Sequence, residues 1–207
     1  MSLDIHSMQE LVGDMSINFS GAIEALREKI ESFIMTSPFS QSGLNGYEGS
    51  SACAVIAIAT GCVFSRETVR RPLKEMAKAF VGCIEFGNGV YQEADYLTPH
   101  EAIMLLPSHN ISIHREKNWF LPQLQDEIIE HFEVTSSRGF VLIVTKGVTV
   151  CTVKIDNTYY LFDSHCAESD MGGYIRRCEK ENLQLFAHFI NCDPTDLIYS
   201  CFVQEDF

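Results

Sequence analysis

The sequence predicts an α+β protein in which N-terminal helices pack on a mainly antiparallel β-sheet. Two observations carry this prediction. In residues 20–132, apolar residues mostly recur every three or four positions or form one continuous run, which is typical of helices. From Gly139 onward they alternate every second position, which is typical of strands. Since no repeat or linker interrupts the 207 residues, we expect a single domain over 1–207, with residues 1–18 as a mobile arm or a short helix.

Five helices are predicted in the first two thirds of the chain from their apolar spacing and their start and stop signals. Thr98, Pro99 and Glu101, for example, have the order of an N-cap residue, a first helical residue and the acid of a capping box. Residues 39–51 are rich in Ser, Gly and Asn and are expected to form a loop, and Gly87-Asn88-Gly89 a turn. The predicted helices cover residues 20–35, 52–62, 65–82, 98–106 and 121–132.

The sheet is predicted mainly in the last third of the chain. Turn signals at Gly147 and at Asp156-Asn157 divide the alternating region into three strands of a meander. Residues 175–189 are expected to contain a helix that separates this meander from a last strand. The predicted strands cover residues 110–115, 140–145, 148–155, 158–163 and 197–204.

The composition limits the kinds of partner. A net charge of −13 argues against a nucleic-acid ligand and suits a partner with a basic surface. No apolar run is long enough to cross a bilayer, and the N-terminus lacks the apolar segment of a signal peptide, so we expect no membrane association. The expected location is the cytoplasm or nucleus, and that of a host cell if the chain is a viral or bacterial effector.

The cysteines are dispersed, and several lie inside apolar runs, which is typical of reduced core cysteines in an intracellular protein. None forms a C-x-x-C pair, so a zinc finger or ribbon is not expected. A metal site at His165 and Cys166 is an alternative that no second ligand pair supports. We therefore expect no metal and no cofactor. The eight cysteines are Cys53, Cys62, Cys83, Cys151, Cys166, Cys178, Cys192 and Cys201.

Cys53 is the candidate nucleophile. It lies in the first turn of a helix that has no polar face and is therefore expected to be buried on all sides. The positive end of the helix dipole favours a thiolate there, and Ser50 and Ser51 are candidate N-cap residues. The small residues 49–52 would let a substrate backbone come close. The alternative is an ordinary core cysteine, because cysteine is among the most buried residue types.

Asp163 and His165 are the candidate partners of this cysteine. They are two positions apart at the end of a predicted strand, so both side chains would project from the same face. If the strand end bends, the carboxylate could orient the imidazole, as a Cys–His pair requires. The alternative is a polar strand terminus followed by a turn. A helix-start cysteine early in the chain and a strand-end histidine late in it is the general layout of papain-like cysteine peptidases.

At these residues the chain resembles, as a divergent relative, the ubiquitin-specific cysteine protease domain at the N-terminus of herpesvirus large tegument proteins. That family has a glutamine in an upstream loop, a Gly/Ser-rich approach to the catalytic cysteine, and Asp-x-His at the end of a hairpin strand. The matching residues here are Gln41, Cys53 and Asp163-Ser164-His165. The resemblance covers residues 37–207 and implies a papain-like fold and cleavage after the C-terminal Gly-Gly of ubiquitin or a ubiquitin-like protein.

The resemblance implies a role for each residue. Cys53 would attack the scissile carbonyl, and His165, oriented by Asp163, would carry the proton to the leaving amine. Gln41 and the Cys53 backbone N–H would form the oxyanion hole, where one donor is typically worth about 3 kcal/mol. The acidic residues Glu48, Glu168 and Asp170 are candidates for the wall of a groove that accepts the Arg-rich tail of ubiquitin.

Two other functions remain open at the level of sequence. The chain could be an acidic protein-binding module, either an inactive relative of such enzymes or an unrelated fold. It could also use Cys53, His165 and Asp163 for acyl transfer, because hydrolysis and transfer differ only in which nucleophile reaches the acyl-enzyme.

Overall fold

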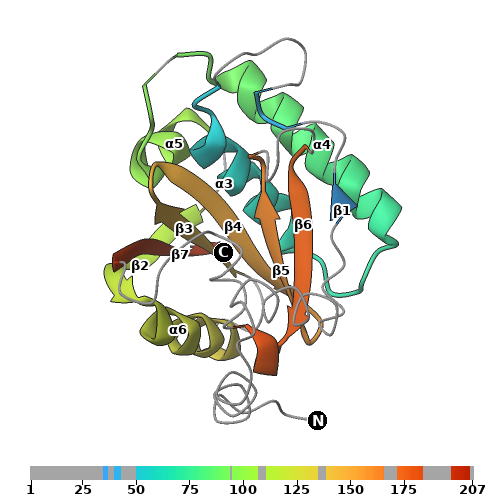
Figure 1. The fold of residues 1–207 in the computed structure, drawn as a ribbon, viewed down its shortest axis with the longest axis vertical. Coiled ribbons are helices and arrows are strands. Elements are labelled where there is room, and N and C mark those ends of the chain that lie inside the picture. Colours follow the sequence, from blue (N-terminus) through green and yellow to red (C-terminus); the bar gives the residue numbers. More distant parts are fainter. Residues whose placement is uncertain are drawn as a thin grey trace, which may run out of the picture.

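A seven-stranded sheet is the centre of the computed structural model, with neighbouring strands antiparallel throughout and the order β1-β6-β5-β4-β3-β7-β2 (Figure 1). The structure describes residues 35–36, 40–42, 50–93, 95–106, 111–134, 139–165, 172–183 and 197–205, and every count below refers to these residues. The strands are β1 (Met35–Thr36), β2 (Ile111–Phe120), β3 (Gly139–Thr145), β4 (Val148–Ile155), β5 (Thr158–Asp163), β6 (Tyr174–Glu179) and β7 (Leu197–Glu205).

The meander β3-β4-β5 agrees with its prediction, and β4 and β5 have the predicted bounds. The β3–β4 register pairs Thr145 with Val148, which leaves a two-residue turn at Lys146 and Gly147. Both turn residues have positive φ, 49° and 79°, as a hairpin turn that follows the twist of the strands requires. These short turns fix the strand register, and the register determines which side chains face each side of the sheet.

Helices cover both faces of this sheet, as Figure 1 shows. The larger core cluster joins one face of the sheet to α3, α4 and α5, and a second cluster joins the other face to α6. Along β3, Phe140 and Leu142 belong to the first cluster, whereas Val141 and Ile143 belong to the second. The strand is therefore buried on both sides, which explains its continuous apolar sequence. The helices are α3 (Cys53–Phe64), α4 (Leu73–Val90), α5 (Pro99–Leu105), α6 (Leu121–Val134) and the 3-10 helix η2 (Lys180–Asn182).

The predicted α+β architecture and three of its helices are confirmed. α3 is buried along almost its whole length, as its apolar sequence predicts. α5 begins with the predicted capping box, in which the Thr98 hydroxyl accepts from the Glu101 N–H and the Glu101 carboxylate accepts from the Thr98 N–H. α6 ends two residues beyond its predicted end. Among the described helices, none combines the length and the apolar character that crossing a membrane would need.

The prediction for α4 is wrong at both ends. The helix begins at Leu73 after Pro72, while Ser65 is instead the C-cap of α3. It then continues through Gly87-Asn88-Gly89, which was expected to form a turn. Packing overrides local preference here, because a Cβ on Gly87 would lie 2.3 Å from Cγ1 of Ile56 and would push α4 away from α3.

Two further helix predictions are covered only in part by the described residues. In the segment 175–189, which was expected to contain a helix, residues 175–179 belong to β6, which pairs with β5 over its full length, and Lys180–Asn182 form the short η2. Residues 184–189 lie outside the described part. The helix expected over residues 20–35 does not include Met35, which pairs with Ile175 in β1, and residues 20–34 lie outside the described part. The predicted strand at residues 110–115 extends to Phe120, since it pairs with β7 along that length.

Candidate active site

Cys53 is the first residue of α3, and its side chain is buried. The N-cap residue is Ala52, and not Ser50 or Ser51 as predicted, and the Ala52 side chain makes no capping hydrogen bond. The Ser50 hydroxyl instead accepts from the Ala52 N–H at 3.2 Å and donates to Oδ1 of Asn88 at 2.6 Å. Ser50 thus ties the entry of the helix to α4, while Cys53 keeps the first-turn position that favours a thiolate.

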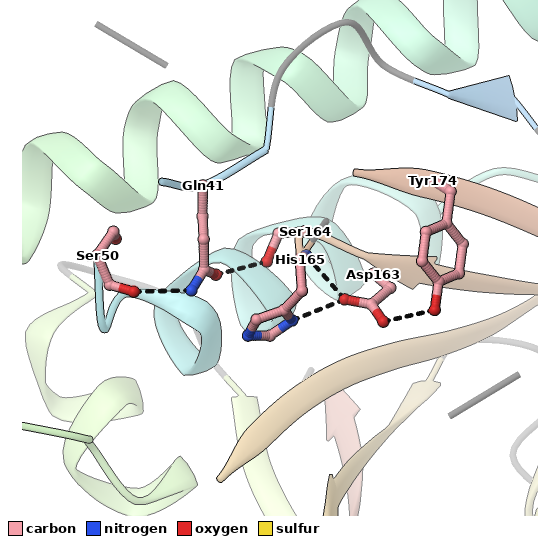
Figure 2. Close-up of polar contacts among 6 residues, drawn as sticks. All are labelled: Gln41, Ser50, Asp163, Ser164, His165 and Tyr174. Atoms are coloured by element: carbon pink, nitrogen blue, oxygen red, sulfur yellow. Dashed lines mark hydrogen bonds and ion pairs between the residues drawn. The ribbon is translucent and has the colours of Figure 1, made fainter. Parts of the chain in front are cut away.

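Asp163 and His165 lie side by side at the end of β5, where the chain bends (Figure 2). Oδ1 of Asp163 is 2.7 Å from Nδ1 of His165 and also accepts from the His165 backbone N–H at 2.8 Å. The second carboxylate oxygen accepts from the Tyr174 hydroxyl at 2.7 Å. These three contacts hold a buried carboxylate in one orientation, so its partner ring is also fixed.

His165 also makes a side-chain hydrogen bond to Cys53, so the ring lies between the carboxylate and the thiol. Burial by itself would lower the pKa of His165, but the hydrogen bonds and charges of Asp163 and Cys53 raise it to about 9. Burial would likewise raise the pKa of the Cys53 thiol, yet the hydrogen bond and charge of His165, with hydrogen bonds to Thr149, hold it below its ordinary value. Each group therefore favours the charged form of the other, a thiolate beside an imidazolium.

Four other buried cysteines behave differently. Burial raises the pKa of Cys83 and of Cys201 to about 11, and burial also places the pKa values of Cys151 and Cys178 above the ordinary range. These thiols stay protonated at neutral pH and serve as core side chains. The lowered pKa of Cys53 is a consequence of its neighbours and not of burial.

Gln41 lies against both segments that carry the candidate triad. Its side-chain N–H donates to the Ser50 carbonyl at 2.8 Å, and its side-chain oxygen accepts from the Ser164 hydroxyl at 2.8 Å. Its backbone N–H donates to the Ser164 carbonyl at 2.8 Å. Figure 2 shows the amide of Gln41 between Ser50 and Ser164, the residue that precedes His165. Since the amide nitrogen carries two hydrogens and the Ser50 carbonyl takes one, the other is a candidate oxyanion donor.

Sequence reasoning missed three residues of this site. Thr149 in β4 hydrogen-bonds Cys53, Tyr174 in β6 holds Asp163, and Asn88 in α4 binds Gln41 and Ser50. Each comes from a different element, so no sequence spacing relates it to the triad. The one signal in the sequence was Asn88, a polar residue between two glycines, but that pattern predicts a turn as readily as a buried helix position.

Some of the predicted candidates cannot be placed. Cys166, Glu48, Glu168 and Asp170 lie outside the described residues. Over the described ranges, no group of three or more His, Cys, Asp or Glu side chains lies close enough to hold a metal ion. The arrangement that is described can generate a nucleophilic thiolate with protein groups alone.

The described elements have the papain-like fold, with the cysteine at the start of a central helix and the histidine at the end of a sheet strand. One solved structure with this fold is the ubiquitin-specific protease encoded by murine cytomegalovirus tegument protein M48, in complex with a ubiquitin-based suicide substrate. The match has a TM-score of 0.60 at 12% sequence identity and covers 83% of this chain and 85% of that one. It confirms the fold that the resemblance implied. No family model matches the sequence, and no curated protein sequence matches it.

Proposed function

We propose that this chain is a cysteine isopeptidase, a deubiquitinase that cleaves after the C-terminal Gly-Gly of ubiquitin or a ubiquitin-like protein. The observation that carries the proposal is the His165 ring between Cys53 and Asp163, with the thiol pKa lowered and the imidazole pKa raised to about 9. A structural cysteine would have no need of such partners, and elsewhere in the described core burial raises the thiol pKa.

In the proposed mechanism the Cys53 thiolate attacks the carbonyl carbon of the terminal glycine and forms a tetrahedral intermediate. One Gln41 side-chain N–H and the Cys53 backbone N–H donate to the oxyanion. The intermediate collapses as His165 gives its proton to the leaving amine, which leaves a thioester on Cys53. His165 then takes a proton from water, which attacks the thioester and releases the carboxylate. Asp163 keeps the imidazole oriented and stabilises its charged form.

Ubiquitin is the proposed partner for two reasons. A protein of the same fold was captured with a ubiquitin-based suicide substrate, and the net charge of −13 complements a basic substrate tail. The test compares kcat/KM for a fluorogenic ubiquitin C-terminal substrate with kcat/KM for short unrelated peptides, over a series of salt concentrations. We expect a strong preference for the ubiquitin substrate that weakens as salt screens the charges. Equal rates on both, without salt dependence, would leave a general thiol hydrolase.

Gln41→Ala is expected to lower kcat about 10²–10³-fold, as the loss of one oxyanion donor does, while KM changes little. The donor acts on charge that develops in the transition state, so it contributes little to substrate binding. Steady-state kinetics on the ubiquitin substrate provides both constants. A change confined to KM would instead make Gln41 a substrate-binding residue.

Asp163→Ala is expected to lower kcat, although the loss should be about 10–100-fold smaller than for removal of the nucleophile. Without the carboxylate the pKa of His165 falls below about 9, because the hydrogen bond and the negative charge of Asp163 that raise it are lost. The alkaline limb of the pH–rate profile should therefore move to lower pH. Tyr174→Phe is the matched control, since it removes one hydrogen bond to Asp163 but keeps the negative charge. An alkaline limb that stays in place in Asp163→Ala would show that the carboxylate does not set the state of His165.

A further inference from the structure

We propose that Asn88 is a positioning residue for the oxyanion site, holding Gln41 in place through a closed set of hydrogen bonds. The inference rests on the proposed function, in which Gln41 donates to the oxyanion, and names a residue in another element on which that role depends. Asn88 lies in the last turns of α4 and is fully buried.

Asn88 uses both ends of its side-chain amide. Its N–H donates to the Gln41 backbone carbonyl at 2.8 Å, and its oxygen accepts from the Ser50 hydroxyl at 2.6 Å. The Ser50 carbonyl in turn accepts from the Gln41 side-chain N–H at 2.8 Å. Asn88 therefore fixes the backbone of Gln41 directly and the direction of its side-chain amide through Ser50.

The same network reaches the strand that carries His165. The Ser164 hydroxyl donates to the Gln41 side-chain oxygen, and the Ser164 carbonyl accepts from the Gln41 backbone N–H, both at 2.8 Å. Between Ser50 and Ser164, both polar ends of the Gln41 amide are engaged, so the amide plane has one orientation. The remaining N–H then points in one direction, which is what a preorganised oxyanion donor needs.

This positioning role explains the residues near the end of α4 better than helix stability does. Gly87, Asn88 and Gly89 all have low helix propensity, and a buried asparagine must have its hydrogen bonds satisfied. Gly87 allows the close approach to Ile56, in the turn of α3 that follows Cys53, and the next residue reaches Gln41 and Ser50. The other buried side chains of α4, over Met76–Ile84, are apolar, so the polar side chain that this helix buries lies where the helix touches the site.

The test compares Asn88→Ala with Cys83→Ala, which removes a buried side chain from the same helix without touching Gln41. We expect Asn88→Ala to lower kcat about 10-fold or more, bounded by the loss in Gln41→Ala, with KM changed less than about twofold. The pH dependence of Cys53 alkylation by iodoacetamide should stay as in the wild type, because Asn88 does not contact Cys53 or His165 in any described interaction. Cys83→Ala should keep the wild-type kcat.

The decisive comparison is the double variant. When Asn88 acts through Gln41, adding Asn88→Ala to Gln41→Ala causes no further loss of kcat. An equal loss with and without Gln41, or an unchanged kcat in Asn88→Ala, overturns the proposal. Ser50→Ala removes the hydroxyl that donates to Asn88 and accepts from the Ala52 N–H, and it keeps the Ser50 carbonyl that Gln41 uses. It should give a smaller loss of kcat that likewise disappears in the Gln41→Ala background, and it serves if Asn88→Ala fails to fold.

A readout that needs no turnover separates this inference from the proposed function. In the wild type, NMR of the two side-chain amide protons of Gln41 should show a rigidly held amide group. The group should become mobile in Asn88→Ala but not in Cys83→Ala. If the wild type cleaves no ubiquitin substrate, the proposed function fails while the amide signals still decide the positioning role. If the Gln41 amide is as rigid in Asn88→Ala as in the wild type, the positioning role of Asn88 is overturned.

Discussion

Cys53→Ala is expected to lower kcat/KM for a ubiquitin C-terminal substrate by about 10⁴-fold or more and to leave the protein folded. The nucleophile and its base act as one unit, so removal of the sulfur removes the covalent route as a whole. The substitution deletes a single buried atom from the start of α3, which leaves only a small cavity and little loss of stability.

Cys83→Ala and Cys201→Ala are the matched controls for this result. Both thiols are buried, and burial raises the pKa of each to about 11, so neither supplies a thiolate at neutral pH. Turnover should stay at the wild-type level in both, and thermal unfolding checks that all three variants are folded. Full activity in Cys53→Ala would move the nucleophile elsewhere in the chain.

His165→Ala is expected to cost nearly as much activity and, in addition, to change the ionisation of Cys53. Burial raises the pKa of this thiol, and the hydrogen bond and charge of His165 lower it more than the hydrogen bonds to Thr149 do. Without them the pKa of Cys53 should rise, because burial is then opposed only by the hydrogen bonds to Thr149, and the thiolate fraction at pH 7 should fall. The rate of Cys53 alkylation by iodoacetamide against pH measures this shift directly.

The same pair determines the pH profile of the wild type. Activity should rise with pH as Cys53 loses its proton, at a pH below the ordinary pKa of a thiol. It should fall as the pH increases through about 9, where His165 loses its proton. His165→Ala should remove the alkaline limb and move the alkylation curve to higher pH. An alkylation curve that is identical in the wild type and His165→Ala would mean that the ring does not stabilise the thiolate.

The parts of the fold that local chemistry determines were predictable. The two-residue turns predicted both bounds of β4 and β5 correctly, and the capping box at Thr98 predicted where α5 begins. The continuation of α4 through Gly87-Asn88-Gly89 was not predictable, because Gly87 is there for close packing against Ile56 of α3, and a glycine required by packing cannot be told from a turn glycine in the sequence. The strand β6 was missed for a similar reason, since its pairing with β5 outweighs an ambiguous pattern.

The candidate site likewise contains residues that the sequence identified and residues that only the fold revealed. Asp163 and His165 could be paired from sequence, since they are two positions apart at a strand end. Thr149, Tyr174 and Asn88 could not be found, because each reaches the site from a different element through tertiary packing. Sequence spacing identifies groups that one element presents together, and the surrounding groups that hold them require the fold.

Capture by ubiquitin that carries a C-terminal electrophile tests the central claim most directly, because it requires the nucleophile and the substrate class at once. Intact mass and peptide mapping would show how many cysteines react and which. The account predicts one ubiquitin adduct on Cys53, absent in Cys53→Ala, much slower in His165→Ala and unchanged in Cys83→Ala. No adduct on the folded wild type, or an adduct that forms equally well in Cys53→Ala, would contradict it.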